Sequence, residues 1–97
     1  MPLYITLLNY TEQGVKNLKE GSQRVTAARQ AVEKAGGKLH SYHLTMGQYD
    51  AVVIAEAPSD EAYATLILSI AAQGNIRSTT LKAFTEEESF RIFDNLP

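Results

Sequence analysis

The sequence predicts an α+β fold with elements in the order β-α-β-β-α-β, followed by a short C-terminal helix. Short apolar stretches rich in β-forming residues alternate with stretches whose apolar residues recur every three or four positions. Two of the predicted strands are separated only by Gly47-Gln48, so they must form an antiparallel hairpin. Glycines close both predicted helices, at Gly36-Gly37 and at Gly74, where the position after a helix favours this residue. The length of 97 residues fits one domain over residues 1–97.

The first half is expected to contain a strand, a long helix and a second strand. Leu3 to Asn9 is short, apolar and rich in Ile, Leu, Thr and Tyr. Thr11 is the predicted N-cap of a helix that runs to about Ala35 with one apolar face. Gly21-Ser22 interrupts this helix and predicts a kink or a restart. The second strand is expected over Lys38 to Met46.

The second half repeats this order. A third strand is expected from Tyr49 to Ala57, before Pro58. Ser59 is the predicted cap of a second helix, which carries acidic residues in its first turn. A fourth strand covers Ile76 to Phe84. Thr85 to Glu88 then fits a capping box for a short last helix, which presents Phe90 and Phe93 on one face.

Two β-α-β units joined by a hairpin form the ferredoxin-like fold, a four-stranded antiparallel sheet with both helices on one face. Strands one and three are apolar on both faces, whereas a sheet with one wet face alternates cleanly. The second face therefore needs a cover, and the simplest one is a second copy, sheet against sheet, as in a dimeric α/β barrel. The alternative is a monomer whose C-terminal helix folds over the open face.

Composition excludes several classes of function. The net charge is −2, whereas nucleic-acid-binding domains are usually basic. The chain has no cysteine, so thiolate catalysis, thiolate metal sites and disulfides are excluded. The N-terminus does not resemble a signal peptide, and the longest apolar-rich run, Tyr63 to Ala72, is too short to span a bilayer. We expect a cytoplasmic protein that binds neither nucleic acid nor membrane and needs no cofactor.

Several motifs resemble those of the GYD-domain family over the whole chain. The core is Gly47-Gln48-Tyr49-Asp50, at a hairpin before an apolar strand that ends Glu56-Ala57-Pro58. Further matches are Asn9-Tyr10-Thr11-Glu12-Gln13-Gly14, Arg24, Gly36-Gly37, and Ile76-Arg77-Ser78-Thr79-Thr80-Leu81. The family is largely uncharacterised, so the resemblance implies a fold but no activity.

Residues from about Ser41 to Phe84 also resemble the effector-binding domain of Lrp/AsnC regulators. The similarity implies ferredoxin-like dimers with small ligands, often amino acids, bound between the subunits. The chain lacks the helix-turn-helix domain of those regulators. The wider dimeric α/β-barrel group also includes cofactor-free oxygenases and isomerases.

The candidate catalytic residues are His40, His43 and Asp50. Either histidine is a possible general base, but a surface or interface histidine is the simpler interpretation. Three positions apart on a regular strand, the two histidines would point to opposite faces, so no metal site is expected. Asp50 is either an acid near an intersubunit cavity or a structural acceptor at the hairpin, with pairing to a partner arginine as a further option.

The candidate ligand-binding residues are Tyr4, Thr6, Asp50 and Arg77. Tyr4 and Thr6 share one face of strand one with Leu8 and Tyr10, which suits either a ligand pocket or a wet dimer interface. Arg77 could hold a carboxylate ligand or an interchain salt bridge. We expect these residues on the sheet face away from the helices.

Three functions remain open. The first is a small-molecule-binding or regulatory module, a homodimer or larger, with its site between subunits on the open sheet face. The second is a small cofactor-independent enzyme, of the oxygenase or isomerase type, with a histidine and Asp50 inside the barrel. The third is a structural interaction protein.

Overall fold

The computed structural model describes residues 1–97 and confirms the predicted order of elements. The four strands are β1 (Leu3–Tyr10), β2 (Lys38–Leu44), β3 (Ala51–Glu56) and β4 (Ile76–Ala83). The helices are α1 (Glu12–Lys16), a short 3-10 helix η1 (Leu18–Glu20), α2 (Gly21–Lys34), α3 (Asp60–Ala71) and α4 (Glu86–Asp94).

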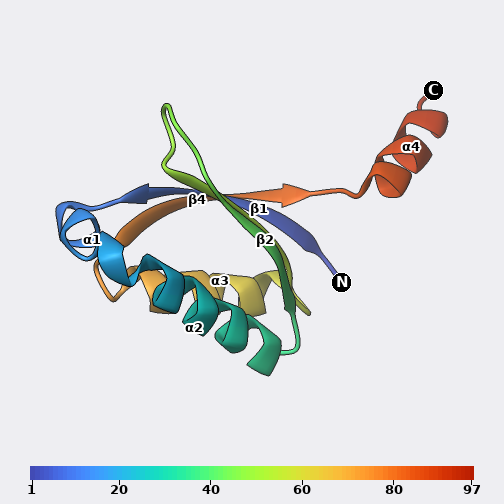
Figure 1. The fold of residues 1–97 in the computed structure, drawn as a ribbon. Coiled ribbons are helices and arrows are strands. Elements are labelled where there is room, and N and C mark those ends of the chain that lie inside the picture. Colours follow the sequence, from blue (N-terminus) through green and yellow to red (C-terminus); the bar gives the residue numbers. More distant parts are fainter.

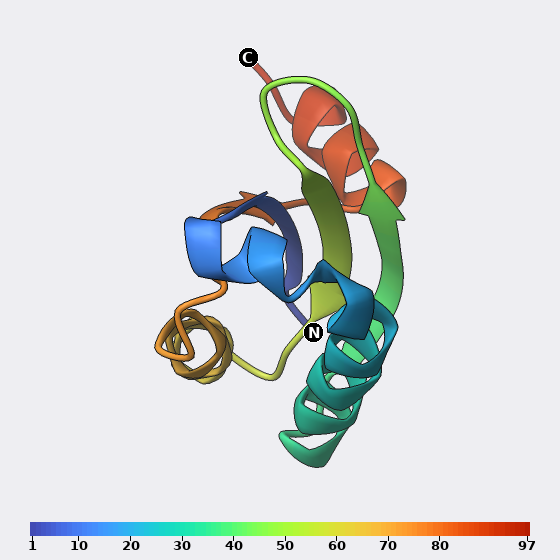
Figure 2. The same ribbon diagram turned by 60° about the vertical axis from the view of Figure 1, so that its left-hand side comes forward.

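The strands form one antiparallel sheet in the order β2-β3-β1-β4, which is the ferredoxin-like arrangement. Both α2 and α3 lie on the same side of the sheet, which curves over them (Figure 1). Turned by 60°, the view shows α3 nearly end-on and well separated from α2 (Figure 2). The fold is therefore two layers, with one face of the sheet left uncovered by its own helices.

The pairing of the strands shows which side chains face the helices. In β1 and β3, every second residue is buried, and these residues point toward α2 and α3. Their helix-side residues are Tyr4, Thr6, Leu8, Ala51, Val53 and Ala55. The alternate residues, on the open face, are also largely apolar. The apolar ones are Leu3, Ile5, Leu7, Val52 and Ile54. The two central strands, β1 and β3, are therefore apolar on both faces, as the sequence indicated.

The long first helix breaks where its glycine predicted an interruption. Thr11 caps α1, and its hydroxyl accepts a hydrogen bond from the backbone N–H of Gly14. The chain then tightens into η1 before α2 starts at Gly21. The break turns α1 toward the start of β4, where Thr11 N–H donates to the Asn75 carbonyl at 3.0 Å.

A bulge in β2 changes the direction of the histidines. Leu39 pairs with Ala55, and Ser41 pairs with the neighbouring residue of β3, Ile54. His40 is therefore an extra residue with no partner in β3, which makes a β-bulge. His40 Nε2 lies 2.7 Å from Glu56 Oε2, and Glu56 belongs to the open-face side of β3. His43 pairs with Val52 of the same side. Both histidines therefore lie on the open face, and the prediction that they point to opposite faces was wrong because β2 is not regular.

The last helix projects from the body. Thr85 and Glu88 form the predicted capping box at its N-terminus. None of the residues of α4 is buried, and the helix lies beyond the end of the sheet (Figure 1). The radius of gyration is 14.5 Å, above the ~13 Å expected for a compact domain of about 100 residues. The alternative in which this helix covers the open face was wrong.

No helix of the structure is both long enough and apolar enough to cross a bilayer.

Candidate functional site

A cavity of about 220 Å³ separates the sheet from the two helices. Its roof is the inner face of α2, where the side chains are small: Ala27, Ala28 and Ala31. Only one residue of α2, Val32 near its C-terminal end, is fully buried. Small side chains on a helix that diverges from its neighbour leave the space between the layers unfilled.

The walls and floor of this cavity are mostly apolar. Leu8, Val53 and Ala55 supply the floor from the sheet, and Leu66, Ile67 and Ile70 line it from α3. The cavity is partly open rather than enclosed. A molecule that bound in it would remove apolar surface from water and would therefore stabilise the folded chain.

Tyrosine and threonine hydroxyls sit at the edges of the floor, and each has a partner within the chain. Thr6 Oγ1 shares a 2.6 Å hydrogen bond with the Tyr63 hydroxyl and a 3.1 Å one with Thr80 Oγ1. The Tyr10 and Tyr42 hydroxyls are hydrogen-bonded to each other. Because these groups are already paired, the inner part of the cavity presents an apolar surface to a bound molecule.

Tyr4 anchors α3 to the sheet beside the cavity. Its ring stacks on that of Tyr63, with centroids 4.2 Å apart and planes 5° from parallel. Its hydroxyl donates to Asp60 Oδ1 at 2.5 Å. Burial, reinforced by the Asp60 carboxylate, raises the pKa of Tyr4 to about 12, and burial likewise raises the pKa of Tyr63. The hydrogen bond from Tyr4 lowers the pKa of Asp60.

These tyrosines are expected to make the protein sensitive to alkali. An unfolded tyrosine ionises near pH 10, whereas Tyr4 in the folded chain holds its proton to about pH 12. Between these values the unfolded state binds fewer protons, so the free energy of unfolding falls as pH rises. We expect loss of stability to begin near pH 10, measured by denaturant unfolding, and to be smaller in Tyr4→Phe. Phenolate absorbance that shows every tyrosine ionising at about pH 10 in the folded protein would contradict this.

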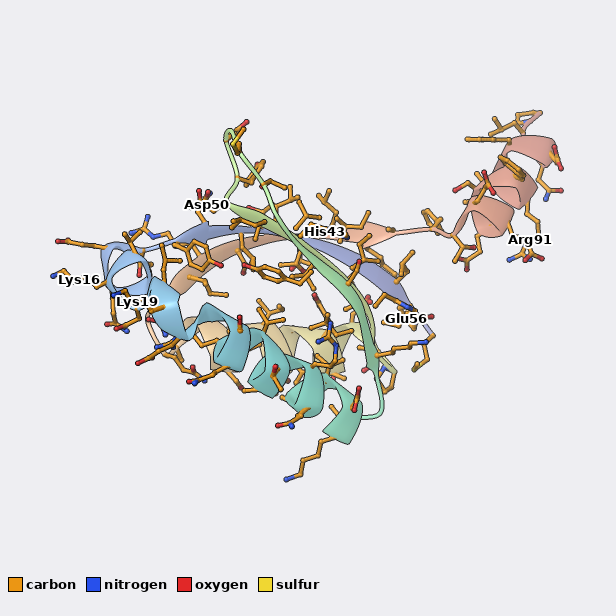
Figure 3. The ribbon with its side chains drawn as sticks, in the orientation of Figure 1. Lys16, Lys19, His43, Asp50, Glu56 and Arg91 are labelled. Atoms are coloured by element: carbon orange, nitrogen blue, oxygen red, sulfur yellow. The ribbon has the colours of Figure 1, made fainter.

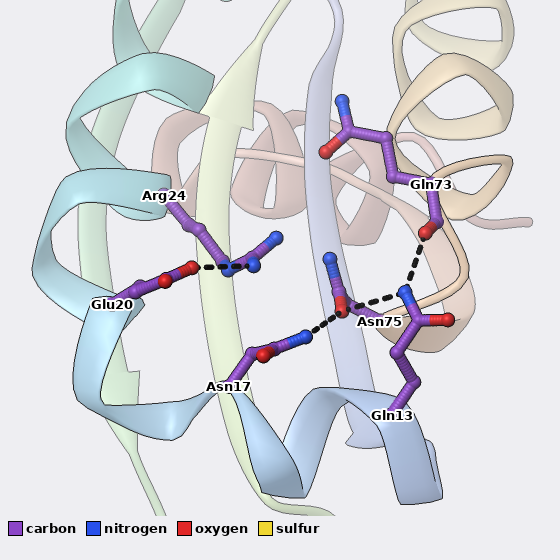
Figure 4. A network of polar contacts seen from close by, with 6 residues as sticks. All are labelled: Gln13, Asn17, Glu20, Arg24, Gln73 and Asn75. Atoms are coloured by element: carbon purple, nitrogen blue, oxygen red, sulfur yellow. Dashed lines mark hydrogen bonds and ion pairs between the residues drawn. The ribbon is translucent and has the colours of Figure 1, made fainter.

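Three polar residues that line the cavity, Asn17, Gln73 and Asn75, lie close together with Gln13, and we call this part of the cavity its mouth (Figure 4). Hydrogen bonds here join two segments that are distant in the sequence. Gln13 Nε2 donates to the Gln73 carbonyl at 2.8 Å and to Asn75 Oδ1 at 3.1 Å. Asn17 Nδ2 donates to the same Asn75 oxygen at 3.4 Å. Asn75 is only 7% exposed, and all four residues except Gln13 line the cavity. The amides therefore tie the first helical turn to the loop that leads into β4.

Arg24 of α2 reaches the same mouth. Its Nη2 pairs with Glu20 Oε2 at 2.9 Å, one turn earlier on the helical segment. Its Nε is buried and has no hydrogen-bond partner. Arg24 is also the only charged residue among those that line the cavity.

The structure separates the predicted ligand-binding residues. Tyr4 and Thr6 lie on the helix side of the sheet, so the expectation that they line the open face was wrong. Thr6 lines the cavity, whereas Tyr4 packs beside it. Arg77 is exposed on the open side of β4, where it pairs with Asn9 of β1. The two alternating sets of residues in β1 are both largely apolar in the sequence. Only the contacts with α3 show which set faces the helices.

Asp50 joins the end of the β2-β3 hairpin to β1. Its Oδ2 accepts a hydrogen bond from the Tyr10 N–H at 2.9 Å, and its own N–H donates to the Leu8 carbonyl. Asp50 lies at one end of β3, far from Glu56 at the other end, with His43 between them along the sheet (Figure 3). Neither histidine, nor Asp50, nor any other Asp or Glu lines the cavity. The titratable side chains that do line the cavity are those of Tyr10, Arg24, Tyr42 and Tyr63.

The residues that make the mouth were not predicted as a site. Asn17, Gln73 and Asn75 are uncharged and belong to no catalytic motif, so only their convergence in space reveals them. Arg24 appeared only as one match to a family pattern. Ala27, Ala28 and Ala31 of α2 contribute to the unfilled space, but alanines in a sequence do not by themselves distinguish a cavity from close packing.

Comparisons with known proteins are consistent with this architecture. The model of the GYD domain matches residues 4–92. A Thermus thermophilus protein, "Glutamine synthetase and cystathionine beta-lyase binding protein", is 29% identical over 84 residues, which are 86% of this chain and 88% of that protein. The crystal structure of TTHA0845 from the same organism aligns with a TM-score of 0.55 at 20% identity, covering 88% of this chain and 95% of that one. At this identity the structural match supports the fold alone.

Proposed function

The chain belongs to the GYD domain family, and we propose that it is an oligomeric regulatory module that binds other molecules without catalysing a reaction. The observation that carries this proposal is the sheet face that no part of the chain covers. The curated relative's name describes a protein that binds two enzymes, which supports a binding role. No histidine and no carboxylate lines the cavity, which supports binding over the enzyme alternative with a histidine and Asp50 in the interior.

Self-association through the open sheet face explains two features at once. The apolar side chains on that face have no cover in one chain, and a large apolar surface on a monomer is unfavourable. Further exposed apolar residues are Phe90, Ile92 and Phe93 in the projecting α4, and Leu96 just beyond it. In a two-fold dimer, the sheets would pack face to face, and each α4 would lie against the partner.

An intersubunit site would lie at one end of this interface. Arg77 pairs with Asn9, and Asp50 binds the N–H of Tyr10, so the two charged residues flank the same end of β1. Asp50 Oδ1 makes no hydrogen bond within the chain. Asp50 and Arg77 are therefore our candidates for polar contacts with a partner subunit or a ligand held between subunits.

Light scattering of the purified protein tests the self-association. We expect a particle with at least twice the mass of one chain at micromolar concentration. Ile54→Lys places a charge in the interface and should weaken the dimer by about 100-fold or more, because an uncompensated buried charge costs about 3 kcal/mol or more. Leu68→Lys on the far side of the molecule, where Leu68 is 68% exposed, is the matched control and should remain a dimer.

We further propose that the module binds glutamine synthetase or cystathionine β-lyase, the enzymes named for its relative, and the same variants test this. Wild type is mixed with purified glutamine synthetase, and separately with purified cystathionine β-lyase, from the same organism. We expect binding to at least one of them, unchanged in Leu68→Lys. A wild-type protein that is only monomeric would refute the interface, and a dimer that binds neither enzyme would refute this choice of partners.

A further inference from the structure

The amide of Asn75 is fixed in one orientation by its neighbours. Its Oδ1 accepts hydrogen bonds from both Gln13 Nε2 and Asn17 Nδ2. An amide that accepts twice through its oxygen must present its Nδ2 hydrogens on the other side. Asn75 is nine-tenths buried, and its Nδ2 donates to no acceptor in the chain.

A second donor without an acceptor lies at the same mouth. Arg24 Nε–H is buried and unpartnered, while the Nη2 end of the guanidinium is held by Glu20. The guanidinium points from α2 toward Asn75 (Figure 4). Buried donors almost always have partners, so the buried Nε–H of Arg24 indicates a missing acceptor. The Asn75 Nδ2 group is not fully buried, but it is a second donor without a partner on the same part of the cavity wall. A carboxylate supplies acceptors in two directions and is favoured by the positive charge.

The rest of the cavity indicates what kind of apolar group a bound carboxylate would carry. Its inner surface is apolar, and the hydroxyls of Thr6 and Tyr63 are already paired with each other. Its volume of about 220 Å³ lies below the ~300–1,000 Å³ of pockets for drug-sized ligands. The space therefore suits one ring or a short branched chain rather than a long lipid.

We propose that this cavity binds a small carboxylate with an aromatic or branched aliphatic body. The carboxylate lies at the mouth, between Arg24 Nε and Asn75 Nδ2, and the apolar body lies under Ala28 and against Ile67. The site is formed by one chain, so it is separate from the intersubunit site and does not depend on the proposed self-association. Binding of this carboxylate would fill the space between the sheet and the two helices.

Titration calorimetry with two matched probes tests the ligand class. We expect hydrocinnamate to bind at least tenfold more tightly than hydrocinnamamide, since the charged group makes the stronger hydrogen bonds. Arg24→Gln should remove this preference, whereas Lys19→Gln, which removes an exposed charge outside the cavity, should retain it. Equal affinity for acid and amide in the wild type would overturn the role of Arg24 and Asn75.

The location is tested by filling the cavity and by NMR. Ala28→Phe should fold with at least wild-type thermal stability and lose binding of both probes, because the ring occupies the ligand's place. In the wild type, hydrocinnamate should shift the signals of the Asn75 side-chain amide and the Ile67 methyl groups. Shifts confined to Leu7 and Ile54 on the open face would overturn the location, and so would no binding at millimolar probe. Either outcome would overturn only the cavity site, because the proposed self-association is tested separately by light scattering.

Discussion

Gly14→Ala is expected to destabilise the protein by about 3 kcal/mol or more, although alanine normally strengthens a helix. A Cβ at Gly14 would lie 2.0 Å from the Asn75 carbonyl oxygen, a backbone atom that cannot move aside as a flexible side chain would. That oxygen accepts the hydrogen bond from Thr11 N–H that joins α1 to β4. The substitution would therefore force the two segments apart and break this bond. Urea unfolding followed by circular dichroism measures the change.

Gly21→Ala is the matched control. Gly21 has helical angles (φ −56°, ψ −45°), and a Cβ built there meets no atom within 4 Å. Alanine at this position should stabilise the protein by about 0.5–1 kcal/mol, because it restricts the unfolded chain more than glycine does. If both alanine variants were to unfold at the same urea concentration as the wild type, the close approach of α1 to β4 would be wrong.

Tyr63→Ala is expected to lower the free energy of unfolding by about 3–5 kcal/mol, as truncation of a buried aromatic residue typically does. Tyr63 is only 4% exposed and is the one buried residue of α3. Its ring stacks on Tyr4 and its hydroxyl bonds to Thr6, so it joins the helix to the sheet at the side of the cavity. With so few buried residues in the core, the chain has little stability left to offset this loss. The same urea titration measures the effect.

Two further variants show which part of Tyr63 matters. Tyr63→Phe keeps the ring and removes the hydroxyl, so it should cost only about 1 kcal/mol. Leu68→Ala, on the exposed side of the same helix, should change stability by less than about 0.5 kcal/mol. A Tyr63→Ala variant as stable as Leu68→Ala would show that α3 is not anchored through this residue.

The order and ends of the elements could be predicted because their signals are local. The caps at Thr11, Ser59 and Thr85 all accept the expected hydrogen bond from a backbone N–H in the first turn. The hairpin at Gly47 and the helix end at Gly36 both use positive φ angles, which glycine adopts without strain. Each of these features depends on residues within four positions of one another.

The faces of the sheet could not be predicted from such local signals. Both parities of β1 are apolar, and the choice between them depends on contacts such as Thr6 with Tyr63, 57 residues apart. The bulge at His40 inverted the expected direction of a side chain, and no glycine or proline marks it in the sequence. The cavity itself is set by the separation of α2 and α3 across the sheet, a property of the assembled layers and not of either helix.

The amides at the cavity mouth also bear on the time course of folding and ligand exchange. Thr11, Gln13 and Asn17 bond to residues 73–75, between 58 and 63 positions later in the chain. Contacts of such long sequence separation carry a high loop-closure entropy and form late. Gln13 and Asn17 can release their bonds by rotating their side chains, but the bond from Thr11 N–H to the Asn75 carbonyl breaks only when α1 and the loop before β4 separate. That separation is a local unfolding event slower than a side-chain rotation. Any widening of the cavity beyond what these side chains allow would then follow the slower motion of the backbone.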